Sequence, residues 1–294
     1  MLIGQRPSRS RPRKGTLKNV DTSGKHKARP RGPQVSVVVP VYHQVEHICD
    51  SIRRISHALK RAFERWEIVV VCDGDYETYK QALKCQASNI HIVGYSENQG
   101  KGYALRFGAG MCTGELVTFI DADGELDPEE ISRMAQLQAL YDADIVVGSK
   151  RHPLSKVSYP LMRRFQSLCY QLLVRCLFRV NVRDTQTGIK LLRRKVAVAV
   201  LPLLLVKRFA FDVELLVVAR QMGFRKVIEA PVTLDYKFSS TTNLKAVLRV
   251  LIDTLAIFYR LYIRRTYQKR MHEFSAYDVV RISDELVEQT PSKV

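Results

Sequence analysis

The sequence predicts an α/β protein with a doubly wound, mostly parallel sheet. Short runs of β-branched and apolar residues alternate with helical patterns through the first half of the chain, as in parallel strands joined by crossover helices. These runs are apolar at nearly every position, which is typical of strands buried on both faces. The 294 residues, 46% of them hydrophobic, suffice for one large domain with appendages.

The regular pattern begins after Gln34 and continues to about Lys150. This first half of the chain is of the type that binds nucleotides. Pro40 ends the first strand because proline has no amide donor, and the Asp73-Gly74 pair ends the second in a turn. The predicted elements in chain order are a strand at 35–39, a helix at about 45–65, strands at 67–72 and 90–94, a glycine-rich turn at 98–102, a helix at about 103–111, and strands at 116–120 and 145–148.

Two strongly apolar helices are predicted in the second half, over residues 159–180 and 244–265. Each carries a narrow polar stripe with spacings of three or four. Basic amphipathic helices of this kind are typical of a bilayer interface, but core-packing helices with an exposed arginine edge give the same pattern. The stripe residues are Arg164, Ser167, Gln171, Arg175 and Arg179 in the first helix, and Lys245, Arg249, Asp253, Arg260 and Arg264 in the second.

The chain is not expected to cross a membrane or to be held together by disulfides. No stretch approaches the roughly 18 consecutive apolar residues of a span, and the N-terminus lacks the apolar core of a signal peptide. No Cys-x-x-Cys pair is present, so the cysteines are predicted to be free thiols in a reducing compartment. They are Cys49, Cys72, Cys85, Cys112, Cys169 and Cys176.

The net charge of +18 is concentrated at the N-terminus. Residues 1–33 contain ten Lys or Arg and one Asp, with few large apolar residues, so a disordered basic tail is predicted there. Such a tail can bind RNA, anionic lipid or an acidic partner, or simply increase solubility. Residues 271–294 form a second, polar tail for which the sequence predicts no function.

Two carboxylates follow the strand at 116–120. Strand alternation points Asp121 and Asp123 the same way, and the turn after them brings Glu125 within reach. Three acidic oxygen donors at the carboxyl end of a parallel strand favour Mg²⁺ or Mn²⁺ together with phosphate oxygens. Isolated Asp pairs are often helix caps, but Asp127 and the residues after it already supply a cap for the next helix.

Seven segments spread over about residues 35–240 match segments of a known family and occur in the same order. They are VSVVVPVYHQVEHI, WEIVVVCDGDYET, ENQGKGYALRFGAGMCTGELVTFIDADGELDPEE, ADIVVGSK, DTQTGIKLLRR, RFAFDVELL and EAPVTLDY. Together they resemble family 2 glycosyltransferases of the GT-A fold, and among them the polyprenyl-phosphate sugar synthases (dolichyl-phosphate mannose and glucose synthases). The resemblance implies a GT-A domain over residues 34–240, and the amphipathic pattern after it predicts a membrane-surface helix over 241–270.

The resemblance also implies where a nucleotide-sugar donor binds. His43-Gln44 stand where the family usually has Asn-Glu, and Cys72 replaces the first Asp of its usual Asp-Asp pair. Both changes remove a carboxylate from the nucleotide side and leave the base identity open. The residues that match the family's donor positions are Pro40, Val41 and Tyr42 at the base, Asp73 at the base or ribose, Lys101 near the nucleotide, and Asp121, Asp123 and Glu125 at the metal and diphosphate.

The stretch after the fifth strand favours a phosphate acceptor. A hydroxyl acceptor needs a carboxylate base, whereas a phosphate monoester, with its second pKa near ~6, is already ionised and needs positive groups. Arg163 and Ser167 are four apart on one helical face, and the resemblance implies an Arg and a Ser there on an interfacial helix. Lys150 stands where that subfamily usually has Arg. The positive groups of this stretch are Lys150, Arg151, Lys156, Arg163 and Arg164, and no acidic residue follows them before Asp184.

Two further pairs of residues are candidate site residues, and each pair has an alternative, structural role. Gln186 and Thr187 are site candidates within DTQTGIKLLRR, or an ordinary loop-capping pair. Asp212 and Glu214 are predicted, with Asp123, as catalytic residues that position the donor sugar or acceptor; alternatively, Asp212 caps the helix that follows.

The sequence therefore predicts inverting, metal-dependent transfer of a hexose from UDP-glucose or GDP-mannose to a polyprenyl phosphate. The enzyme would be peripheral, at the cytoplasmic face of a membrane. One alternative is a hydroxyl acceptor on a glycan or lipid, with Asp212 or Glu214 as base. Another is a basic nucleic-acid-binding or scaffold protein, but no predicted strand interleaves aromatic and basic residues, so no specific nucleic-acid partner is expected. Neither the sugar nor the oligomeric state is defined.

Overall fold

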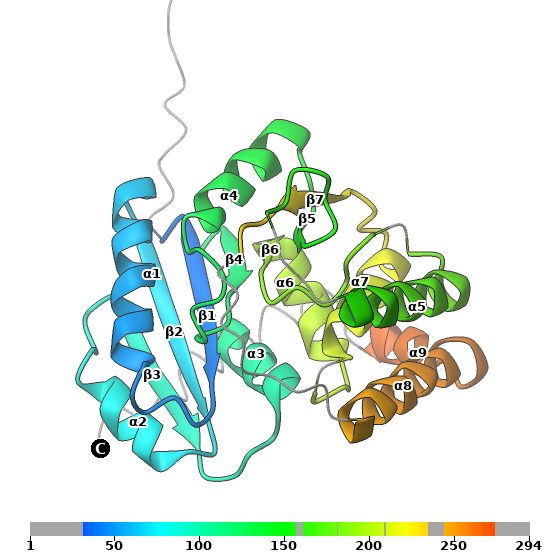
Figure 1. Cartoon of the computed structure of the whole chain (residues 1–294), viewed down its shortest axis with the longest axis horizontal. Coiled ribbons are helices and arrows are strands. Elements are labelled where there is room, and N and C mark those ends of the chain that lie inside the picture. Colours follow the sequence, from blue (N-terminus) through cyan, green and yellow to red (C-terminus); the bar gives the residue numbers. More distant parts are fainter. Residues whose placement is uncertain (1–31, 157–160, 181, 209, 235–243, 274–294) are drawn as a thin grey trace, which may run out of the picture. The chain divides into compact units, whose positions relative to one another are not determined.

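The computed structural model describes residues 32–156, 161–180, 182–208, 210–234 and 244–273 (Figure 1). The elements, in chain order, are β1 (Val35–Val41), α1 (Ile48–Ala62), β2 (Trp66–Asp73), α2 (Tyr76–Leu83), β3 (Ile90–Tyr95), α3 (Lys101–Gly110), β4 (Leu116–Phe119), α4 (Glu130–Tyr141), β5 (Ile145–Ser149), α5 (Leu161–Phe178), β6 (Lys190–Arg193), α6 (Arg194–Val200), the 3₁₀ turn η1 (Leu201–Leu203), α7 (Phe211–Gln221), β7 (Val227–Pro231), α8 (Leu244–Phe258), the π-helical turn η2 (Tyr259–Ile263) and α9 (Thr266–Glu273).

The strands form one mostly parallel sheet in the order β3-β2-β1-β4-β6-β5-β7. Only β6 is antiparallel, to β4 on one side and β5 on the other. Because β1 pairs with β4 in parallel, with Val38 opposite Phe119, the loops after both strands emerge at the same edge of the sheet. Ligands of open α/β sheets bind at this edge, outside the carboxyl ends of the strands.

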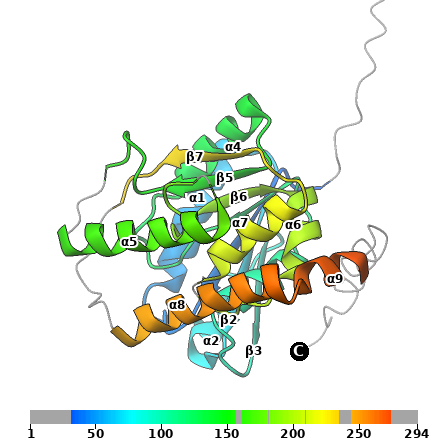
Figure 2. The same ribbon diagram turned by 90° about the vertical axis from the view of Figure 1, so that its right-hand side faces the viewer.

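Helices cover both faces of the sheet, as the doubly wound prediction requires. One apolar cluster packs α1 and α4 against one face, and a second packs α3 and α5 to α9 against the other. Strand β1 serves both clusters, since Val37 and Val39 belong to the first and Val38 to the second. Figure 2 shows α5, α7 and α8 side by side over the second face.

The predicted strands are confirmed to within about two residues at each end, whereas strands β6 and β7 and helices α2, α6 and α9 were not predicted. Strand β6 has four residues and begins with the buried Lys190, so its sequence lacks the apolar run of a central strand. Strand β7 is an edge strand in which only Ala230 is fully buried. Helix α2 is a third such element, with only eight residues.

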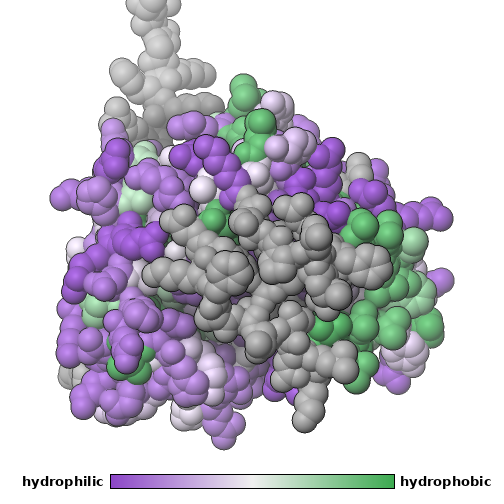
Figure 3. Space-filling model, in the orientation of Figure 1, coloured by the Kyte–Doolittle hydropathy of each residue, from purple (hydrophilic) through white to green (hydrophobic). Residues whose placement is uncertain are grey.

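Helices α5 and α8 exist where two amphipathic helices were predicted. Helix α8 buries Thr254 and Ile257, while Leu248, Ile252 and Leu255 are more than half exposed. The two helices join through a hydrogen bond of 2.9 Å between the hydroxyl oxygens of Tyr170 and Thr254. Figure 3 shows hydrophobic surface gathered where Figure 1 places these helices. We define the α5/α8 patch as the exposed large apolar residues of this region: Leu168, Leu172, Leu248, Ile252, Leu255, Tyr259, Tyr262 and Ile263.

Within the residues that the structure describes, no helix is both long and apolar enough to cross a bilayer. The basic tail predicted for residues 1–33 and the polar tail predicted for 271–294 fall almost entirely outside these residues. Both remain predictions.

Candidate active site

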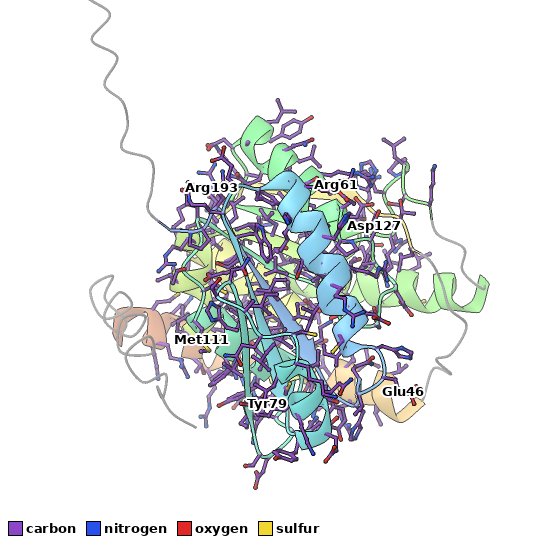
Figure 4. All side chains as sticks on the ribbon, turned by 90° about the vertical axis from the view of Figure 1, so that its left-hand side faces the viewer. Glu46, Arg61, Tyr79, Met111, Asp127 and Arg193 are labelled. Atoms are coloured by element: carbon purple, nitrogen blue, oxygen red, sulfur yellow. The ribbon has the colours of Figure 1, made fainter. Side chains whose placement is uncertain are left out.

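The acid pair lies in the turn directly after β4. The strand ends at Phe119, so Asp121 and Asp123 belong to the turn rather than to the strand. Between them Ala122 is buried, and its carbonyl oxygen accepts a 2.6 Å hydrogen bond from the Ser51 hydroxyl of α1. The turn is thus fixed to the helix at Ala122, and the two carboxylates remain partly accessible. Figure 4 shows α1 over the sheet, with Asp127 of the following segment beside it.

Lys101, the first residue of α3, pairs with the first carboxylate. Its ammonium nitrogen lies 2.5 Å and 2.7 Å from the two carboxylate oxygens of Asp121. Burial lowers the pKa of Lys101, but the nearby carboxylates, Asp121 first and Asp212 next, outweigh burial and raise it overall. Lys101 is therefore held charged next to the acid pair.

The acid pair fits a divalent cation bound together with phosphate oxygens. Burial and the adjacent Asp121 raise the pKa of Asp123, because two close carboxylates concentrate negative charge. Two carboxylates plus diphosphate oxygens and water suit Mg²⁺ or Mn²⁺, which seldom rely on protein ligands alone.

The predicted third carboxylate is not preassembled with this pair. Among the described residues, no three Asp, Glu, His or Cys side chains converge into a metal-binding group. The backbone N–H of Glu125 donates to Asp123 Oδ1 at 3.0 Å. Glu125 as a metal ligand therefore stays a prediction.

Asp73 fastens the loop that leads into α3. Its carboxylate is buried, and its two oxygens accept the N–H groups of Gln99 at 2.7 Å and Gly100 at 2.9 Å. Gly100 has φ +96°, and a Cβ on Gly74, at φ +73°, would lie 2.1 Å from the Asn98 nitrogen. Glycine is required at both positions. Asp73 thus sets where Lys101 begins its helix, and its predicted contact with base or ribose is a separate, untested role.

The donor-side residues meet around one cavity of about 470 Å³, a volume typical of small-ligand sites. Seven of its lining residues were predicted from the sequence: Pro40, Val41, Tyr42, Asp73, Lys101, Asp121 and Asp123. Five more were not: Gln44, Asn98, Gly100, Ala122 and Arg208. Arg208 brings a positive charge to the cavity, next to Gly100, from a segment far away in sequence where no local pattern marks it.

The two departures from the family pattern have different structural consequences. Cys72 is a core residue, and burial raises the pKa of its thiol to about 12, so it is unreactive. His43, at φ +53°, directs its backbone N–H and Nδ1 to one oxygen of Asp75, at 2.9 Å and 3.1 Å. Hydrogen bonds, first from the Thr78 hydroxyl and then from His43, lower the pKa of Asp75 despite some desolvation. Asp75 is thus a charged carboxylate beside the cavity residue Tyr42, whose ring centroid lies 3.8 Å from that of His43.

The loop over residues 184–188 packs against the acid pair. Asp184 organises it by accepting the Lys150 N–H at 3.0 Å and the Thr187 hydroxyl at 2.6 Å. A Cβ on Gly188 would lie 2.0 Å from Asp121 Oδ2, so this loop fixes the position of the carboxylate. Thr187 is buried and fits the loop-capping alternative, whereas Gln186 is exposed and its site role stays a prediction.

Asp212 does not cap α7, contrary to one of its two predicted roles. The helix N-cap is Ala210, without a side-chain cap. Instead Asp212 Oδ1 lies 2.8 Å from the ammonium of Lys190, which is 1% exposed and also donates to the Thr187 carbonyl at 2.7 Å. A buried lysine paired with Asp212 was not predicted; its only signal was a charged residue inside the apolar run GIKLL.

Glu214 corrects the prediction of a catalytic carboxylate at that position. It is fully buried and does not line the cavity. Its oxygens accept the N–H groups of Leu205, at 3.0 Å, and Val206, at 2.8 Å, and the hydroxyl of Tyr267. Burial raises its pKa although these donors oppose the rise. The position two residues after Asp212 in FDVELL was predicted as part of a site, but helical geometry turns the Glu214 side chain into the core.

The predicted acceptor residues are only partly described. The positive charge of Lys150 is one of the influences that lower the pKa of Asp123, so it lies on the acid-pair side. Arg163 and Ser167 belong to α5 as predicted, but their side chains lie outside the described set. Arg151 ties the start of this region to α5 through a hydrogen bond to Gln171.

Together the fold and the cavity define a GT-A type of protein: a mostly parallel sheet with a nucleotide-sized cavity and an Asp-x-Asp pair at the carboxyl ends of β1, β2 and β4. A family model described as glycosyl transferase family 2 matches residues 36–201. The chain belongs to this family and is a glycosyltransferase.

Among the relatives found by sequence is a dolichyl-phosphate beta-glucosyltransferase of Trichomonas vaginalis, 31% identical over 241 residues, 76% of this chain and 71% of the relative. The Homo sapiens dolichyl-phosphate beta-glucosyltransferase is 32% identical over 207 residues, 64% of this chain and 63% of the relative. An undecaprenyl-phosphate 4-deoxy-4-formamido-L-arabinose transferase of Pseudomonas fluorescens is 31% identical over 172 residues, 57% of this chain and 49% of the relative.

Solved structures confirm the fold. Mannosyl-3-phosphoglycerate synthase of Rubrobacter xylanophilus superposes with a TM-score of 0.61 at 17% identity, over 79% of this chain and 75% of that one. Glucosyl-3-phosphoglycerate synthase of Mycobacterium tuberculosis, in complex with Mn²⁺, UDP and phosphoglyceric acid, gives 0.59 at 19% identity, over 77% of this chain and 78% of that one.

Proposed function

We propose that this glycosyltransferase moves glucose from UDP-glucose to a polyprenyl phosphate of the dolichyl-phosphate class. The observation that carries the proposal is the cavity that unites Tyr42 and Asp73 with Lys101 and the Asp121/Asp123 pair. The choice of glucose and of a lipid phosphate draws on the relatives that carry this activity in their names. GDP-mannose is the second donor candidate.

The charged residues of the cavity suit a leaving diphosphate. Asp121 and Asp123 would hold Mg²⁺ or Mn²⁺, which supplies stabilisation of the negative charge that develops on the leaving group. Lys101 neutralises Asp121, and Arg208 offers a guanidinium that can bind phosphate oxygens in bidentate fashion. One in-line displacement at the anomeric carbon would invert its configuration.

A phosphate acceptor is consistent with the carboxylates around the cavity, because it does not require one of them to act as a base. Such a nucleophile is ionised at neutral pH and needs cations rather than a base, a role proposed for Lys150, Arg163 and Ser167. A polyprenyl chain also requires a route to a membrane, and the α5/α8 patch is an exposed apolar surface of the kind that binds at bilayer interfaces. We therefore propose peripheral attachment, at the cytoplasmic face, where nucleotide sugars are supplied.

The hydroxyl-acceptor alternative has little support around the cavity. With Glu214 in the core, Asp212 is the only predicted base that remains, and it is 7% exposed and ion-paired with the buried Lys190. If Asp212→Asn retained full turnover, the hydroxyl version would lose its last base.

The test is transfer of labelled sugar by the full-length protein, with UDP-glucose and GDP-mannose as donors and polyprenyl phosphate or the matching polyprenol as acceptor. We expect chloroform-extractable label from UDP-glucose with the phosphate only. Label on the polyprenol would overturn the phosphate acceptor. Removal of residues 1–33 should leave transfer intact, whereas it would abolish function in a nucleic-acid-binding protein that depends on the tail.

Asp123→Ala is expected to lower transfer at least on the order of a hundredfold. The fold should stay intact, because Asp123 lies in a turn and belongs to neither apolar cluster. Circular dichroism and the thermal midpoint check the fold. Undiminished transfer in this variant, or in excess chelator, would contradict the metal assignment.

A further inference from the structure

The segment over residues 202–208, between α6 and α7, reaches the donor cavity from outside the first half of the fold. The carbonyl of Lys207 accepts the N–H groups of Gly102 at 2.9 Å and Tyr103 at 3.2 Å. These belong to the first turn of α3, whose N–H groups lack partners within the helix. The next residue, Arg208, lines the cavity. The segment therefore both caps the helix that begins with Lys101 and brings an arginine to the wall of the cavity, next to Gly100.

This segment is held mainly by one buried carboxylate. Glu214 of α7 accepts the backbone N–H groups of Leu205 and Val206, and the hydroxyl of Tyr267 from α9 donates to the same carboxylate. Glu214 and Tyr267 are both fully buried. A buried carboxylate is costly unless its oxygens are satisfied, so each of these donors matters to the geometry of the segment.

Helix α9 makes a second contact with the same segment. Arg270 Nη2 donates to the Pro202 carbonyl at 3.0 Å. From the opposite side, Arg106 of α3 donates to the Leu204 carbonyl. The segment is thus held between α3, which starts the donor site, and α9, which lies outside the residues matched by the family model. Figure 2 shows α8 leading into α9 along one edge of the molecule.

We propose that Tyr267 and Arg270 of α9 are positioning residues for the donor: they fix segment 202–208, and so hold Arg208 in the wall of the cavity, where its guanidinium can bind the diphosphate of the donor. Tyr267 acts through Glu214, and Arg270 through the Pro202 carbonyl. The C-terminal helix is then part of the donor site without touching the donor. The inference rests on the proposed function only for what Arg208 binds.

Hydrogen exchange in the full-length protein tests the first half of the inference. In Tyr267→Phe the ring still packs, but Glu214 loses one hydrogen-bond donor. We therefore expect the Leu205 and Val206 amides to exchange about tenfold faster, which is the usual effect of one hydrogen bond to a charged group. Tyr141→Phe is the matched control, since Tyr141 is 59% exposed on α4. Equal exchange of segment 202–208 in wild type and Tyr267→Phe would overturn the proposal.

Binding of UDP in the presence of Mn²⁺, measured by titration calorimetry, tests the second half. Tyr267→Phe and Arg208→Ala should each weaken binding several-fold. The double variant should bind no more weakly than Arg208→Ala alone, because the hydroxyl acts through the arginine. Additive losses, or unchanged UDP binding in Tyr267→Phe, would overturn the role assigned to α9.

These outcomes are separable from failure of the proposed function. A wild-type protein that binds neither UDP nor GDP would count against the donor assignment, and the positioning of Arg208 at a donor would fall with it. The exchange result would still decide whether α9 fixes segment 202–208.

Discussion

At the residue scale, the acid pair depends on a glycine that lies 67 positions from it in the chain and in direct contact with it in space. Gly188 approaches Asp121 so closely that a Cβ would lie 2.0 Å from Oδ2. We expect Gly188→Ala to displace this carboxylate from Lys101 and to lower kcat/KM on the order of a hundredfold, as small misplacements of reacting groups do.

Gly32→Ala is the matched control, because its Cβ would meet only an ordinary contact at 3.5 Å. Initial rates of sugar transfer, with the thermal midpoint of each variant, measure the effect. Wild-type kcat/KM in Gly188→Ala would show that the loop can yield and that Asp121 does not depend on it.

The site residues that could be predicted from the sequence are those that a local spacing identifies. Residues that only tertiary contacts bring to the site could not be predicted. Asp121 and Asp123 have one residue between them directly after an apolar run, so their spacing in the chain keeps them close in the turn that follows β4. Arg208 and Lys190 have no such signal, because their neighbours at the site come from other elements. The prediction for Glu214 failed for the opposite reason. Glu214 lies close to Asp212 in the chain, but closeness in sequence does not determine which face of a helix a side chain occupies.

At the element scale, one exposed carboxylate links three elements at the edge of the sheet opposite the cavity. Asp142 follows α4 in the left-handed conformation, at φ +50°, and pairs with Arg193 of β6 and Lys226 next to β7. The hydrogen bond from Lys226, and then that from Arg193, lowers the pKa of Asp142 to about 2. The interaction stabilises the fold at pH values above the unfolded pKa near 3.8 and is lost as the pH falls toward 2.

We expect Asp142→Asn to lower the free energy of unfolding at pH 7 by a modest amount, because the pair is exposed and solvent screens it. Asparagine tolerates the left-handed conformation, so the backbone cap is kept. The difference from wild type should shrink between pH 7 and pH 3, as urea unfolding would measure. Asp50→Asn, which breaks only a pair within α1, is the control, and a pH-independent difference in Asp142→Asn would contradict the linkage.

Elements were predictable where burial on both faces makes a strand continuously apolar, and not where charge interrupts it. Strand β1 has six buried residues out of seven and was plain in the sequence. Strand β6 runs antiparallel between β4 and β5 and starts with Lys190, whose ammonium is satisfied by Asp212 and a carbonyl. A buried lysine in a central strand is allowed only by those partners, and they cannot be read from the strand itself.

At the scale of the whole molecule, about half of the exposed large apolar side chains among the described residues lie in the α5/α8 patch. The sequence left open whether these helices lie on a bilayer or pack in the core, because both give a narrow polar stripe. In the structure α8 does both: Ile257 is buried in the apolar cluster that includes residues of α5 and α7, while Leu248, Ile252 and Leu255, spaced by four and three residues, remain in solvent. A large exposed apolar patch on a glycosyltransferase with proposed lipid acceptors favours attachment to membranes.

We expect the double variant Ile252→Glu/Leu255→Glu to lose binding to vesicles of mixed neutral and anionic phospholipid by roughly tenfold or more, since each side chain contributes about 1.5–3 kcal/mol when fully buried and less at an interface. The fold should survive, because these side chains are 58% and 54% exposed in the free protein. Co-sedimentation with vesicles measures the loss, and Leu140→Glu, at a leucine 74% exposed on α4, is the control.

Transfer to a short, water-soluble polyprenyl phosphate should remain, because the donor cavity is untouched and only access to a bilayer-bound acceptor is removed. Unchanged vesicle binding would rule out the α5/α8 patch as the attachment surface, and equal loss with both acceptors would mean that the patch supports the active site rather than the membrane contact.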